Sequence, residues 1–260
     1  MSVAEYESIL ADLVDRKIIT LDEAASLLSR FLRGDFEEDG LPLPFEQASR
    51  KGDDNTLLLL FLSLIPHPNQ QSGRITLNNR RGKRDRARSM SEERIIALSV
   101  ALSEGEITIS EWQREMMVIV GGSITAQWMI GYGRLDGQSP MGDEIGTQYQ
   151  FLYRYASELH VLNELGRQRS EEYIAHRSLS YLGAAWAAWF VGNESLGGGD
   201  GYVSQYIAKD DRSTCNPCRS AVGYYRLGQG PLPGQICLGG GACRCERIMI
   251  YAPEIARNLV

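Results

Sequence analysis

The residues Asp211-Arg-Ser-Thr-Cys215-Asn-Pro-Cys218 begin a cysteine-rich region that continues through Cys237 to Cys243-Arg-Cys245. These are all five cysteines of the 260-residue chain, and none precedes residue 215. A C-x-x-C pair followed roughly 20 residues later by more cysteines has the spacing of a metal knuckle. The sequence therefore predicts a metal site in the C-terminal region.

A structural zinc ion takes four ligands at the corners of a tetrahedron, and thiolates suit it well. Cys215 and Cys218 flank an Asn-Pro turn that can direct both sulfur atoms at one point. Cys237 supplies a third ligand, and Cys243 and Cys245 compete for the fourth place. We therefore predict a structural Zn²⁺ held by these cysteines, with one thiol left over, and either of the last two can be the ligand.

Disulfides, free thiols and a thioredoxin-type redox pair are alternative roles for the cysteines. Grouped thiols in a reducing cytoplasm favour metal over disulfide. The glycine-rich sequence after Cys218 cannot form the long helix that the redox motif needs. A catalytic zinc is disfavoured because His67, His160 and His176 lie outside the region and an all-thiolate site is normally closed to water. No Ser-His-Asp set, phosphate loop or dinucleotide fingerprint is visible, so we do not expect an enzyme.

The composition allows a sizeable core and disfavours broad nucleic-acid binding. The chain is 43% hydrophobic, with a formal net charge of −6 and a pI near 5.3. An acidic balance of this kind argues against wholesale contact with phosphates. The longest apolar runs, such as 57–65, are too short to span a bilayer, and the N-terminus has no secretory leader. We expect a soluble chain made in the cytoplasm, with neither a membrane nor a small-molecule substrate as partner.

The first 200 residues have helical patterns, whereas the cysteine-rich end has strand-like ones. Two T-x-x-E boxes, Thr20–Glu23 and Thr108–Glu111, are typical of helix starts. The predicted fold class is mainly α, a helical body with a small zinc-stabilised β-rich C-terminal module. The predicted division is an N-terminal helical region, a basic linker, a helical domain and a cysteine-rich metal-binding module, at residues 1–65, 66–90, 91–200 and 201–260.

The basic linker contains the run Arg80-Arg-Gly-Lys-Arg-Asp-Arg-Ala-Arg88. Such a run can contact nucleic-acid phosphates, but it is also typical of a solvated, flexible connection. No aromatic residue is interleaved to stack on bases. We therefore interpret 66–90 as a mobile linker, with contact to DNA through Arg80–Arg88 as a second hypothesis.

Several of these motifs together resemble the C-terminal signature of a family of phage minor head proteins, the family named for protein F of phage Mu. They are Asp211-x-x-x-Cys215-x-x-Cys218, Gly223-Tyr-Tyr225, Pro231-Leu-Pro-Gly234 and Cys243-Arg-Cys245. The usual signature ends in a histidine followed by C-R-C, and here Cys237 stands in the place of the histidine. The resemblance covers roughly residues 105–250 and is most specific at the cysteines.

The resemblance implies a minor structural or head-assembly protein of a tailed bacteriophage, made in the bacterial host and located in the virion head. It implies the phage portal or the major capsid protein as partner. Packaged DNA is a further candidate contact, which rests on the arginine run and not on the resemblance. Two other classes stay open at this point. One is a nucleic-acid-binding zinc protein that uses the basic linker, and the other is a thiol- or metal-dependent enzyme.

Overall fold

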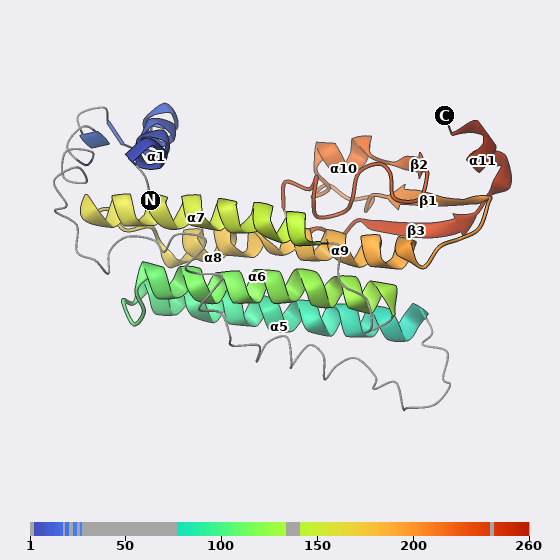
Figure 1. The fold of residues 1–260 in the computed structure, drawn as a ribbon, viewed down its shortest axis with the longest axis horizontal. Coiled ribbons are helices and arrows are strands. Elements are labelled where there is room, and N and C mark those ends of the chain that lie inside the picture. The colour runs from blue at the N-terminus through green and yellow to red at the C-terminus, as the bar shows by residue number, and fades with distance from the viewer. Residues whose placement is uncertain are drawn as a thin grey trace. The chain divides into compact units, whose positions relative to one another are not determined.

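The computed structural model describes residues 3–17, 19, 20, 23, 24, 27, 77–133, 141–239 and 242–259 (Figure 1). These residues form mainly helices, with a three-stranded antiparallel sheet near the C-terminus. The predicted fold class, a helical body with a small β-rich C-terminal module, is therefore confirmed. The predictions for residues 28–65, and for the part of the linker at 66–76, lie outside the described residues.

The described residues fall into two compact units, and each unit combines separate segments of the chain. The first takes its residues from 1–53, 97–117 and 149–175. The second takes its residues from 54–96, 118–148 and 176–260, so it includes the whole cysteine-rich region. The cysteines therefore lie in the same unit as the helical segments that pack beside them.

In the first unit, α1 (Val3–Asp15) packs its apolar face on the end of α7 (Gly142–Glu164). Tyr6, Leu10 and Leu13 are buried with Val161 and Leu162 in one apolar cluster. The cluster follows from the three- and four-residue spacing of apolar side chains along α1, which places them on one side of the helix. Burial of this stripe holds α1 in the unit.

Both predicted capping boxes are present. The Glu23 carboxylate accepts from the backbone N–H of Thr20 at 2.8 Å, and the N–H of Glu23 donates to Thr20 Oγ1 at 3.3 Å. Thr108 and Glu111 form the same pair of bonds, at 2.8 and 3.2 Å, at the start of α6 (Ile109–Tyr132). The donated hydrogen bonds from Thr20 and Thr108 lower the pKa of both glutamates, which keeps these carboxylates charged at the helix ends.

The second unit is organised around α9 (Leu182–Ser195), whose residues from Leu182 to Phe190 are all buried. Helix α9 follows α8 (Glu171–Ser180) and crosses α6 at a pair of glycines. A Cβ atom on Gly131 would lie 2.2 Å from the Trp189 carbonyl oxygen, and one on Gly192 would lie 2.2 Å from the Trp128 carbonyl oxygen. The two backbones thus approach more closely than any side chain would allow.

The prediction of a mobile linker is wrong for residues 77–90, which form the first part of α5 (Leu77–Ser103). Arg84 is buried, with its guanidinium carbon 4.3 Å from the Trp186 ring and 4.8 Å from the Trp189 ring. Arg80 donates to the carbonyl oxygen of Gly131 at 2.8 Å. These arginines thus contact aromatic rings and a carbonyl oxygen of this chain, and their apolar stems add packing contacts. Because of these contacts, residues 77–90 form a packed helix.

The sheet has the strand order β2-β1-β3, and both pairings are antiparallel. Its strands are β1 (Tyr202–Ile207), β2 (Gly223–Tyr225) and β3 (Glu246–Tyr251), with the short helices α10 (Asn216–Ser220) and α11 (Pro253–Asn258) beside them. Arg247 of β3 and Glu194 of α9 form a buried ion pair at 2.7 Å, which joins the sheet to the helix.

Among the described helices, none is long and apolar enough to cross a membrane.

Candidate metal centre

The five cysteines lie on three short segments of the C-terminal module. Cys215 precedes α10 with an extended backbone, at φ −70° and ψ 155°, and Cys218 lies within that helix. Pro217 occupies its first turn, where the missing N–H costs no hydrogen bond. Cys237 lies in the connection between β2 and β3, and Cys243 and Cys245 come directly before β3. The fold therefore brings all five predicted ligands to one end of the sheet.

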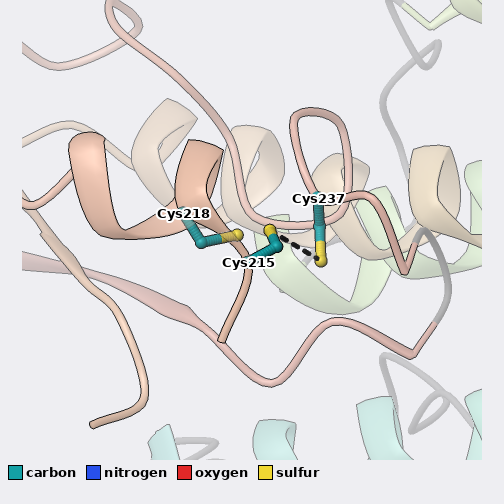
Figure 2. A group of neighbouring side chains, drawn as sticks. All are labelled: Cys215, Cys218 and Cys237. Atoms are coloured by element: carbon teal, nitrogen blue, oxygen red, sulfur yellow. Dashed lines mark hydrogen bonds between the residues drawn. The ribbon is translucent and has the colours of Figure 1, made fainter. Parts of the chain in front are cut away.

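The sulfur atoms form two groups of three that share Cys218. Cys215, Cys218 and Cys237 form the outer triad, and Cys218, Cys243 and Cys245 form the inner triad. Within each triad all Sγ atoms lie within 4.8 Å of one another. Figure 2 shows the three sulfur atoms of the outer triad lying close to one another.

This cluster can hold a metal ion. With Zn–S bonds of about 2.3 Å, the sulfurs of a tetrahedral site lie about 3.8 Å apart. The Sγ atoms of Cys215 and Cys237 are 3.9 Å apart. All five cysteines are free thiols, with Cys218, Cys243 and Cys245 buried and the other two half-buried. Within the described part of the chain, the two triads are the only groups of His, Cys, Asp or Glu placed to share one ion.

The surroundings of the thiols determine how readily each of them ionises. Burial raises the pKa of Cys218, and it raises that of Cys243 to about 12. Burial also opposes ionisation of Cys215, but hydrogen bonds from the backbone of Leu238 and Cys218 outweigh it and lower its pKa to about 7. The buried thiols therefore need a positive partner before they become thiolates, and a metal ion supplies that charge.

Tyr206 is a site residue that the sequence analysis missed. It lies in the central strand β1, is fully buried and donates from its hydroxyl group to Cys218 Sγ at 3.3 Å. Burial and the neighbouring thiols raise its pKa, so it stays a hydrogen-bond donor. It supports the one sulfur atom that both triads share, in the manner of the outer hydrogen bonds that orient metal ligands.

Asp211 and Arg244 form a second supporting contact. Arg244, between the last two cysteines, reaches both carboxylate oxygens of Asp211 at 2.9 Å. Asp211 also accepts from the N–H and hydroxyl groups of Ser213, and with Arg244 these bonds lower its pKa to about 2. The pair ties the segment before Cys215 to the segment that carries Cys243 and Cys245. The sequence signal was the aspartate four residues before the first cysteine, but its partner could not be assigned without the fold.

The histidines do not join the cluster. His160 is buried in α7 and His176 is exposed on α8, and both lie outside the cysteine module. His67 lies outside the described residues. The side chains brought together in this cluster are therefore all cysteines.

Comparisons with protein families, with curated proteins and with solved structures find no match to this chain. The class of protein is therefore defined by its own fold and site. It is a mainly helical protein with a small C-terminal sheet and a cysteine cluster that can hold a metal ion.

Proposed function

We propose that this chain is a minor structural or head-assembly protein of a tailed bacteriophage, and that one structural Zn²⁺ holds its C-terminal module together. The observation that supports the proposal most is that the parts of the sequence signature contact one another in space. Asp211 pairs with Arg244 at 2.9 Å, and Cys218 lies within 4.8 Å of Cys243 and Cys245. These parts of the signature, which are distant in the sequence, thus lie together in one module, as the parts of a shared structural motif do.

The chemistry of the cluster fits a structural ion better than a catalytic one. A zinc ion with four thiolates has no open position for water, and thiolates are the usual ligands of closed sites. The module around it has short strands and exposed apolar side chains such as Val222 and Leu238, which are 58% and 78% exposed. Small modules use a bound metal as a cross-link between their segments, and the proposed ion supplies one here.

The contacts of the arginine run favour this proposal over a nucleic-acid-binding protein. Arg80 donates to Gly131, and Arg84 lies on two tryptophan rings. Arg81 pairs with Glu246 at 3.1 Å, and Arg88 pairs with Glu92 at 2.7 Å. Charges held in this way within the chain are poorly placed to replace the counterions of a phosphate backbone.

Two measurements test the two halves of the proposal. Elemental analysis of the chain purified without oxygen is expected to give one zinc per chain, and a metal-free protein would rule out the zinc centre. Mass spectrometry of particles from a bacterial culture that produces the phage is expected to find the chain in mature heads or in assembling heads. Its absence from both would overturn the structural role, and with it the portal or major capsid protein as partner.

A further inference from the structure

The five thiols of the cluster differ in their access to solvent. Cys218, Cys243 and Cys245 are buried, whereas Cys215 and Cys237 are both half-buried. The two accessible thiols also face each other, with their Sγ atoms 3.9 Å apart (Figure 2). Accessible thiolates react first with oxidants, because reaction requires both ionisation and contact with the reagent.

We propose that Cys215 and Cys237 are an oxidation site, at which a peroxide forms a disulfide and thereby displaces the metal ion. The proposal rests on the zinc centre proposed above, since the disulfide removes two of its ligands. The three buried thiols that remain cannot complete a four-thiolate tetrahedron. The disulfide replaces the ion as the cross-link between the start of α10 and the connection from β2 to β3.

The reaction balances with the peroxide as the only oxidant. One of the two thiolates attacks a peroxide oxygen, so an S–O bond forms, the O–O bond breaks and a sulfenic acid results. The second thiolate attacks that sulfur, the S–S bond forms, and the oxygen leaves as hydroxide. The two thiolates lose two electrons in total, and hydrogen peroxide takes up those electrons and two protons to give two molecules of water.

The other pairings are less accessible or more restrained. Cys218 is fully buried within α10 and accepts a hydrogen bond from Tyr206. Cys243 and Cys245 are buried directly before β3. Cys237, by contrast, lies in a connection outside the helices and strands. A disulfide of about 2 Å between Cys215 and Cys237 therefore requires their sulfur atoms to close a gap of 3.9 Å, without displacing a residue from within a helix or strand.

The test uses the full chain, purified without oxygen, loaded with zinc and treated with one equivalent of hydrogen peroxide. Released zinc is measured with a chromophoric chelator. The remaining thiols are alkylated, and disulfide-linked peptides are identified by mass spectrometry without reduction. We expect the first disulfide to join Cys215 to Cys237, with one zinc released for each disulfide and with the far-UV circular dichroism unchanged. A first disulfide that includes Cys218, or zinc release with only sulfinic acids, would overturn the proposal.

Two variants make the test specific. Cys237→Ser is expected to form no disulfide with peroxide, whereas Cys245→Ser, the same change at a buried cysteine, is expected to form the same first disulfide as the natural chain. If Cys237→Ser does not fold, the disulfide found in the peptide map of the unaltered chain still shows whether Cys215 and Cys237 are the first pair to be oxidised.

The outcome also separates this inference from the zinc centre on which it rests. A chain purified without metal would contradict the zinc centre, and with it the displacement of the ion. Peroxide treatment of that metal-free chain would then show whether Cys215 and Cys237 still form the first disulfide. A zinc-bound chain whose first disulfide lies elsewhere would contradict the oxidation site alone.

Discussion

Helix α9 and the cysteine module are neighbours in the chain but are stabilised in different ways. Helix α9 is buried from Leu182 to Phe190, with tryptophan rings and a glycine contact at its surface. The module, residues 201–259, has large apolar side chains in solvent, and its segments meet at a cluster of thiols and at the Asp211–Arg244 ion pair. Apolar burial needs no partner molecule, whereas a thiolate cluster requires a metal ion. The two regions should therefore respond differently to mutation and to metal removal.

The largest expected effect is loss of the module when Cys218, the thiol shared by both triads, is replaced by serine. Zinc binding should fall to near zero, because apparent affinities of roughly 10–16 kcal/mol depend on a complete ligand set. Proteolysis should then cut within residues 201–259, while far-UV circular dichroism shows the long helices intact. Val222→Ser, at an exposed position of the same module, is the control and should keep its zinc. Simultaneous loss of the helices would contradict the contrast between the two regions.

The next largest effect is expected from Arg84→Ala, which changes the helical region around α9 rather than the cysteine module. The change removes a buried guanidinium that contacts the Trp186 and Trp189 rings, and should cost about 2–4 kcal/mol. Urea unfolding should show this decrease in the free energy of unfolding, and the zinc content of the protein should stay the same.

Arg86→Ala, at an exposed position of the same helix, provides the matched control and should be nearly neutral. Equal destabilisation by both substitutions would show that the charge of α5, rather than the packing of Arg84, stabilises the region.

A third effect concerns the glycine contact between α6 and α9. Gly131→Ala places a methyl group 2.2 Å from the Trp189 carbonyl oxygen, so the helices must separate, at a cost of about 1–3 kcal/mol. Gly82→Ala lies in α5 with nothing within 4 Å of the new methyl group, and should instead stabilise the protein by about 0.5–1 kcal/mol. The Tm values of the two variants should thus shift in opposite directions. A shift of the same sign in both would contradict the close crossing of α6 and α9.

The features that the sequence predicted are those that depend on neighbouring residues. The capping boxes at Thr20 and Thr108 use side chains three residues apart, so their bonds can be inferred from spacing. The C-x-x-C pair likewise located the start of the cysteine cluster, and strand-like patterns located the sheet. Each of these inferences needed only the local chain.

The features that it missed depend on partners that are distant in the sequence. The run at 80–88 has the composition of a linker, and only the tryptophans of α9 give Arg84 a place to pack. Tyr206 contacts Cys218 because the fold brings β1 next to α10. Sequence patterns cannot predict such contacts, because neither residue of the pair stands out in its local sequence.

The smallest expected effect comes from the ion pair that joins the two cysteine segments, and it tests how far the module depends on metal alone. Asp211 and Arg244 lie near the surface, so Arg244→Ala should lower Tm by only a few degrees. The native pKa of Asp211, about 2, lies below its ordinary value. Its contribution is therefore complete above the ordinary aspartate pKa near 4 and is lost as the pH falls toward 2.

An NMR titration of the Asp211 carboxyl group provides the direct measurement. In Arg244→Ala its pKa should rise toward the ordinary value while staying depressed by the bonds from Ser213. Arg212→Ala, an exposed arginine in the same segment, should leave that pKa unchanged. If Arg244→Ala also abolishes zinc binding, the ion pair has a larger role than a surface contact, and the metal would depend on it to bring the two cysteine segments together.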